Sequence, residues 1–154
     1  DELFDEGSFL DGPASGEALL SSPLRPLDGN VEMANALVDL AALTGDERYR
    51  EVAQETIAAF AGAWDRIGVQ VAAYGTAAAR LLRDPLVVEL NDGVGSDLHR
   101  AALRVADHEA LVVPDADADG LPAGTARVSA GETAVEATTP EELMEAVSTV
   151  TPDA

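Results

Sequence analysis

Lysine is missing from the sequence, and all nine basic residues are arginine, against 29 acidic residues and a formal net charge of -20. In dilute buffer, uncompensated charges of one sign repel one another and oppose a compact state. At about 1 M ionic strength the Debye length falls to about 3 Å, and the repulsion is screened. Arginine pairs bidentately with carboxylates, whereas lysine places a long apolar stem on the surface. The composition predicts adaptation to molar salt, as in the cytoplasm of a halophile that accumulates salt. The alternative is an ordinary acidic protein that lacks lysine by chance or through a GC-rich genome.

Cysteine is absent too, which excludes a disulfide scaffold, a thiolate metal site and redox chemistry by this chain itself. Aromatic residues make up 4%, so the core must consist of alanine, valine and leucine. No apolar run approaches the roughly 18 residues of a membrane span, and nothing resembles a signal peptide. An acidic surface also repels nucleic-acid phosphates and anionic lipid headgroups. We expect a cytoplasmic protein without a cofactor, a nucleic-acid partner or a membrane partner. Because the sequence opens with Asp1 rather than methionine, we expect the natural chain to begin further upstream.

Residues 1–84 are predicted to form a helical block behind a long leading loop. Glycine and proline punctuate residues 1–29, which leave room for one helical turn near residues 17–21. Apolar residues at three-four spacing then predict helices over about residues 31–43, 46–61 and 69–82. Asp28 or Asn30 is expected to cap the first helix and Asp46 the second, with Gly45 between them. The short connection makes the first two helices an antiparallel hairpin.

Residues 85–154 are predicted to form a small α/β tail domain of order β-α-β-β-β-α. The expected strands cover about residues 86–90, 110–113, 125–129 and 133–137, and the expected helices cover about residues 96–106 and 140–148. The crossover between the first two strands implies a parallel pair. A tight turn at Ala130-Gly131-Glu132 makes the last two strands a hairpin, and Thr139 opens a capping box. The predicted fold class is α+β, a helical hairpin block followed by this tail.

One acidic loop resembles part of a calcium site. Asp115, Asp117 and Asp119, followed by Gly120, match the opening of an EF-hand loop, in which alternating carboxylates converge on the cation. The position of the bidentate glutamate is occupied by Ala126. The pattern favours a solvated acidic turn, with a weak cation site as the alternative.

No complete catalytic site is expected in this chain. His99 and His108 are nine residues apart, and a continuing helix would place them on opposite faces. Ser96 and Asp97 precede His99 at a helix start, where an N-cap and first-turn charge explain them without a nucleophile.

The segments Asp28-Gly29-Asn30, Leu40 to Tyr49 (LAALTGDERY) and Ala58 to Gly62 (AAFAG), with Asn35 between the first two, carry a family resemblance. They resemble the C-terminal stretch of the YyaL-like, spermatogenesis-associated, thioredoxin-domain-containing proteins. Members have a thioredoxin-like domain, then an (α/α) toroid similar to sugar epimerases and six-hairpin glycosidases, then a short α/β tail. The resemblance implies that residues 1–84 end the toroid and that Asp28, Gly29 and Asn35 line its cavity.

Two departures from the family pattern bear on function. Glu32 and Met33 stand where the family has a Pro-Ser pair, and no cysteine pair precedes the segment that begins at Pro140. We therefore expect a non-catalytic structural part of a larger protein, whose partner is the remainder of its own chain and whose exposed helix faces favour self-association when it is isolated. One alternative is a helical-repeat interaction module. Another is part of a sugar-directed, epimerase-like or redox enzyme whose catalytic residues lie upstream.

Overall fold

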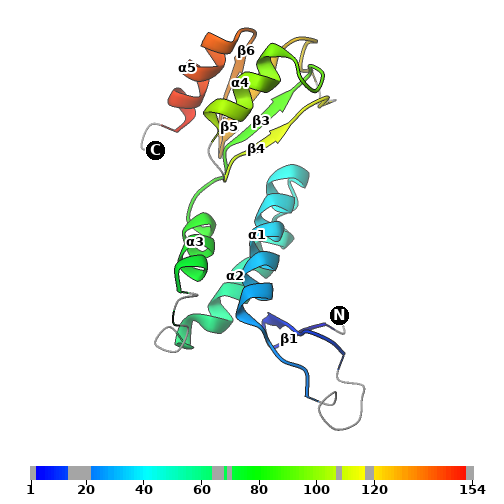
Figure 1. Ribbon diagram of the computed structural model, residues 1–154, viewed down its shortest axis with the longest axis vertical. Helices are drawn as coiled ribbons and strands as arrows, with labels where there is room; N and C mark the ends of the chain where they lie inside the picture. The colour runs from blue at the N-terminus through cyan, green and yellow to red at the C-terminus, as the bar shows by residue number, and fades with distance from the viewer. Residues whose placement is uncertain are drawn as a thin grey trace. The chain divides into compact units, whose positions relative to one another are not determined.

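The computed structural model describes residues 3–13, 22–63, 68, 71–106, 109–116 and 120–151. Within these ranges the chain has five α-helices and two sheets, which confirms the α+β class (Figure 1). It divides into two compact units, Asp1–Arg83 and Asp84–Ala154. In the described ranges, no helix combines the length and the apolar character needed to cross a membrane.

The first unit is built on three helices, α1 (Leu27–Thr44), α2 (Glu47–Phe60) and α3 (Val71–Leu81), with one 3-10 turn, η2 (Ala61–Ala63), after α2. Gly45 ends α1 in the left-handed conformation, φ 68°, and Asp46 caps α2 by accepting a hydrogen bond from the Arg48 backbone N–H. Hydrogen bonds from the Arg48 side chain and backbone lower the pKa of Asp46. The buried core is small and aliphatic: Val31, Ala34, Leu37, Val38, Ala53, Ile57, Ala77 and Leu81.

The leading segment differs from its prediction in two ways. A small antiparallel sheet, β1 (Phe4–Asp5) and β2 (Ser8–Phe9), occupies part of the expected loop. Helix α1 begins at Leu27, four residues earlier than predicted, with Pro26 at the N-cap and no side-chain cap. Prolines fit a helix start because their φ is already close to helical values. The predicted turn near residues 17–21 lies outside the described ranges.

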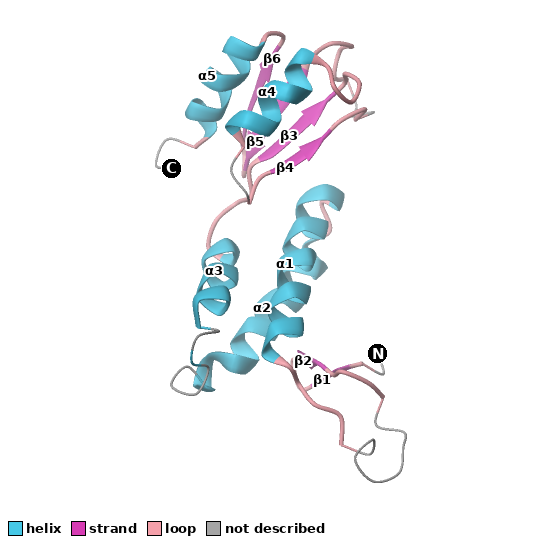
Figure 2. Cartoon of the chain, in the orientation of Figure 1, coloured by secondary structure: helices cyan, strands magenta, loops and turns pink. Residues whose placement is uncertain are grey.

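The second unit contains β3 (Val87–Leu90), α4 (Asp97–Val105), β4 (Leu111–Val113), β5 (Ala126–Ala130), β6 (Thr133–Ala137) and α5 (Pro140–Val150). The sheet order is β4-β3-β5-β6, with β3 parallel to β4 and antiparallel to β5. Figure 2 shows α4 and α5 on the same face of this sheet. The buried core lies between that face and the two helices, with Val88, Leu90, Val128 and Leu143 at its centre.

The other face of the sheet is covered by neither α4 nor α5, the two helices described in this unit. Arg127 pairs in register with Glu89 on one side and Glu136 on the other. Its guanidinium nitrogens lie 3.9 Å from Glu89 Oε2 and 3.5 Å from Glu136 Oε1. Val87 and Leu111 form a paired, half-buried apolar row beside this ion-pair ladder. The unit is therefore two layers thick.

Local hydrogen bonds define the ends of α5 and the β5–β6 hairpin. Thr139 accepts from the Glu142 N–H, while the Glu142 carboxylate accepts from the Thr138 N–H and hydroxyl, each at 2.8 Å. These hydrogen bonds hold the pKa of Glu142 below its ordinary value of 4.5. The hairpin turn is shorter than predicted: Gly131 and Glu132 alone connect the strands, and Ala130 pairs with Thr133. Gly131 has a φ of 57°, which the first position of a type II′ turn requires.

Candidate functional site

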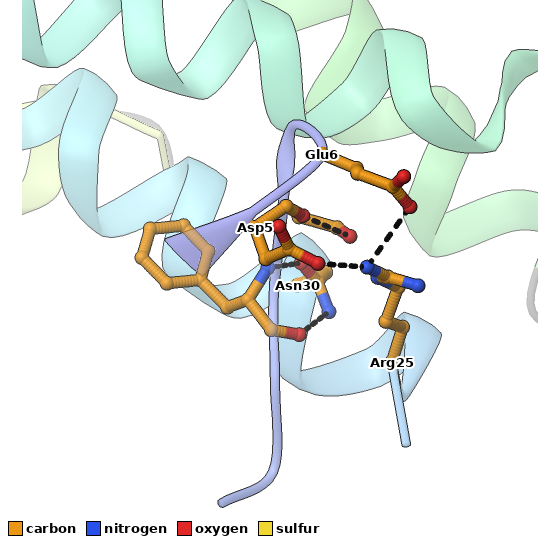
Figure 3. A network of polar contacts seen from close by, with 6 residues as sticks. Asp5, Glu6, Arg25 and Asn30 are labelled. Carbon is orange, nitrogen blue, oxygen red and sulfur yellow. Dashed lines mark hydrogen bonds and ion pairs between the residues drawn. The ribbon is translucent and has the colours of Figure 1, made fainter. Parts of the chain in front are cut away.

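Asn30 is the most deeply buried polar side chain in the first turn of α1, with 1% exposure. Its Oδ1 accepts from the Phe9 N–H at 2.7 Å, and its Nδ2 donates to the Phe9 carbonyl at 2.9 Å and the Pro26 carbonyl at 2.8 Å. Figure 3 shows the side chain between β2 and the start of α1. Because its polar atoms serve this contact, Asn30 does not cap α1 as predicted.

On the solvent-exposed side of the same region, Arg25 forms ion pairs with two acidic residues of the β1–β2 hairpin. Arg25 Nη2 lies 2.6 Å from Asp5 Oδ2 and 3.2 Å from Glu6 Oε2. Figure 3 shows the guanidinium directed at both carboxylates. Glu6 and Gly7 both have positive φ, 49° and 77°, as in a type I′ hairpin turn. These ion pairs are exposed, so each contributes about 1 kcal/mol at most. The arrangement is a structural clamp rather than a set of groups directed at a ligand.

The three residues predicted to line a cavity all lie on α1. Asp28 and Gly29 are exposed in its first turn, within the helix rather than in the leading loop predicted for residues 1–29. Asp28 and Asn35 are seven residues apart and so share one helix face, while Gly29 projects from another. The cavity itself would need helices beyond this chain, so their lining role stays a prediction.

Asn35 accepts a hydrogen bond from an arginine that was not predicted as a site residue. Arg80, on α3, donates from Nη1 to Asn35 Oδ1 at 3.0 Å and from Nη2 to Asp39 Oδ1 at 2.5 Å. The Arg80 side chain is only 11% exposed, and Asp39 is 34% exposed. The ion pair with its extra hydrogen bond satisfies a mostly buried guanidinium and joins α3 to α1.

The acidic loop is only partly within the described ranges. Asp115 follows β4 with a φ of 52°, and its N–H donates to the Asp92 carbonyl at 3.1 Å, whereas Asp117 and Asp119 lie outside the described ranges. Asp92 follows β3, so it shares the carboxyl edge of the parallel β3–β4 pair with Asp115, a position at which α/β sheets often bind ligands. Asp92 was not predicted as a site residue, although its place soon after a strand can be seen in the sequence. Among the described residues, no three histidine, aspartate or glutamate side chains are grouped so that they could hold a metal.

The start of α4 forms a cap. Ser96 Oγ accepts from the His99 N–H at 3.1 Å, and His99 Nδ1 accepts from the Gly95 N–H at 3.0 Å. Asp97 pairs with Arg100 at 2.6 Å. His99 therefore uses Nδ1 on the backbone and not on Ser96, in keeping with the interpretation as a cap, and His108 lies outside the described ranges.

Comparison of the chain with models of known protein families, with curated proteins and with solved structures finds no match. The polar groups described above serve hydrogen bonds within each unit. Helix α1 also has a second row of apolar side chains, which lies on the exposed surface of the helical unit. Its large members are Met33, Leu40 and Leu43, at 41%, 40% and 51% exposure.

Proposed function

We propose that this chain is the C-terminal structural part of a larger cytoplasmic protein of a halophilic archaeon. In this proposal a thioredoxin-like domain and an (α/α) toroid precede it, α1 to α3 complete the toroid, and the α/β unit forms the tail. The catalytic residues of any reaction, sugar-directed or redox, belong to the upstream domains. Asp28 and Asn35, which share one face of α1, then face the toroid cavity, whereas Gly29 lies on the neighbouring face.

The observation that carries the proposal is that α1 is apolar on two faces. One face supplies Val31, Ala34 and Val38 to the core of the helical unit. The other carries Met33, Leu40 and Leu43, which remain 41%, 40% and 51% exposed. A helix that is apolar on several sides is typical of the interior of a larger assembly. These side chains are already about half buried, so burying the rest of each would contribute about 1 kcal/mol, roughly half of the value for a fully exposed side chain, which favours a neighbouring helix.

Thiol labelling can test the proposal cleanly because the chain has no cysteine. Met33→Cys places a single thiol in the second apolar row, and Glu132→Cys places a control thiol in the exposed hairpin turn of the tail. Both variants are made in this chain and in the longest polypeptide that its gene encodes, and labelling is followed by peptide mass spectrometry. We expect the Met33→Cys thiol to be labelled at least tenfold more slowly in the longer polypeptide, with the control unchanged. Equal rates for the Met33→Cys thiol in the two polypeptides, or an open reading frame without upstream thioredoxin-like and helical segments, would refute the proposal.

A further inference from the structure

The second apolar row of α1 has a regular spacing. Its members, Gly29, Met33, Ala36, Leu40 and Leu43, follow one another at intervals of four, three, four and three residues, and all five are exposed. This is the 3.5-residue period of a coiled-coil seam, in which two apolar positions recur in every heptad. We call these five residues the α1 seam. The spacing fits one straight helix lying along α1 better than it fits an irregular surface.

The charge beside the α1 seam is of one sign. Glu32 and Asp39 flank the seam residues Met33 and Leu40 on the same side, and Asp28 lies one residue before Gly29. Helix α1 contains no basic residue. Arg80 neutralises Asp39, whereas neither Asp28 nor Glu32 has an ion pair with another described residue. The opposite flank is uncharged, since Asn30 and Leu37 are buried there and Thr44 ends the helix.

We propose that the α1 seam binds one α-helix that has its own 3.5-residue apolar seam and arginines along the flank that meets Glu32. This inference rests on the proposed function, because we assign that helix to the upstream part of the same polypeptide. Flanking charges set partner choice in paired helices. Arginine is the complementary residue, since it pairs bidentately with carboxylates and stays charged at any accessible pH. A second copy of the chain fits less well, because it would bring an acidic flank and a net charge of -20 against the same charges.

Two synthetic peptides of three heptads serve as probes. Both have leucine at the two seam positions, and they differ only at the flanking positions, where one has arginine and the other glutamate. Binding is measured by fluorescence anisotropy at the lowest KCl concentration at which circular dichroism shows the chain folded. We expect the arginine peptide to bind at least tenfold more tightly than the glutamate peptide, and Glu32→Arg to reduce that preference at least threefold.

The apolar part of the seam needs its own variant, because an acidic protein attracts basic peptides non-specifically. The double variant Met33→Gln, Leu40→Gln should weaken arginine-peptide binding at least tenfold. Its matched control is Leu82→Gln, at a side chain that is 87% exposed and outside the seam, and this control should bind as the wild type does. Circular dichroism of each variant confirms that the fold is intact, as expected for exposed positions.

Three outcomes would overturn the inference: equal binding of the two peptides, undiminished binding to the double variant, or sedimentation showing a dimer of the chain that the double variant abolishes. The inference and the proposed function fail separately. If the Met33→Cys thiol is protected in the longer polypeptide but the peptides bind equally, only the arginine-flanked helix is wrong. If the arginine peptide binds selectively but the Met33→Cys thiol stays equally reactive, the seam serves another protein and the proposed function is wrong.

Discussion

Asn30 joins two segments that are distant in sequence with a single side chain. Its three hydrogen bonds reach Phe9, twenty-one residues earlier, and Pro26. Replacing it removes the hydrogen-bond partner of the half-buried Phe9 N–H and carbonyl, beside a side chain that is itself only 1% exposed. We expect Asn30→Ala to lower the free energy of unfolding of the helical unit by about 2–3 kcal/mol, because each unsatisfied buried group costs about 1–3 kcal/mol.

Urea denaturation of Asn30→Ala in molar KCl measures this loss. The matched control is Gln54→Ala, at an exposed position of α2, which should stay within about 0.5 kcal/mol of the wild type. An Asn30→Ala variant as stable as the control would mean that the β1–β2 hairpin contributes little to the unit.

Glu142 makes the stability of the tail depend on pH. Its folded-state pKa is lowered by hydrogen bonds from Thr138, so the folded state binds fewer protons than the unfolded state. The stabilisation is therefore present above the ordinary pKa of 4.5 and is lost as the pH falls through the lowered value. Glu142→Gln keeps a hydrogen-bond acceptor but cannot titrate, so it should reduce the fall in stability between about pH 6 and about pH 3.

The exposed neighbour Glu141 provides the control for this pH dependence. Glu141→Gln removes the same charge from the first turn of α5 without touching the Thr138 contacts. Denaturation midpoints of both variants are measured across the pH range. The difference between them gives the effect of the capping hydrogen bonds on stability, because both variants lose the same negative charge. Identical profiles for the two variants would show that the cap has no role.

At the scale of elements, α3 is held to α1 by one mostly buried arginine. Arg80→Ala removes the hydrogen bonds to Asn35 and Asp39 while leaving the small apolar contacts of Ala77. Hydrogen bonds to charged groups contribute about 1.5–3 kcal/mol, so the amides of α3 should exchange roughly ten to one hundred times faster. Hydrogen exchange with mass spectrometry reports this change.

The exposed ion pair of Arg48 with Asp46 is the comparison for Arg80. Arg48 is 85% exposed, so Arg48→Ala should leave α3 exchange unchanged. Amides of α5, in the other unit, provide an internal reference in both variants. If Arg80→Ala leaves α3 as protected as before, packing alone holds the helix.

Helix ends were predictable from sequence where one local hydrogen bond decides them. Gly45, Asp46, Ser96 and Thr139 occupy the expected capping positions, because an N-cap or C-cap involves residues only a few positions apart. The start of α1 was predicted too late because Asn30, expected as a cap, lies inside the helix and uses its side chain on Phe9 of a distant strand as well as on Pro26. The sequence close to Asn30 does not indicate a contact with a strand 21 residues away.

The candidate site was less predictable than the fold. Asn35 was singled out by resemblance, but its partner Arg80 is 45 residues away, and only the packing of α3 brings the two together. The α1 seam was overlooked for another reason. Its 3.5-residue spacing overlaps the 3.6-residue spacing of the core face, and the buried residues account for the more obvious pattern.

At the scale of the whole molecule, charge is unevenly divided. Residues 84–154 contain 15 of the 29 acidic residues but only three of the nine arginines. Between about 0.1 M and about 1 M salt the Debye length falls from about 10 Å to about 3 Å, which removes most of the repulsion. We expect the thermal midpoint to rise by roughly 10 °C or more across a KCl series, and the tail to gain more protection than the helical unit.

Circular dichroism and hydrogen exchange across that KCl series check both parts of this prediction. Sucrose at matched osmolarity distinguishes charge screening from general exclusion of a solute from the protein surface. Full stability at low ionic strength, about 0.05 M, would count against salt adaptation and leave the absence of lysine as an accident of composition.

The central position of β3 has a consequence for the rate of folding. The β5–β6 hairpin closes over Gly131 and Glu132, and a hairpin of this kind forms in about 1–10 μs. Strand β3 pairs with β4 across the crossover that contains α4, and with β5 across an even longer stretch of chain. Contacts between residues far apart in sequence slow folding. We therefore expect the insertion of β3 between β4 and β5 to be the step that limits how fast the tail refolds.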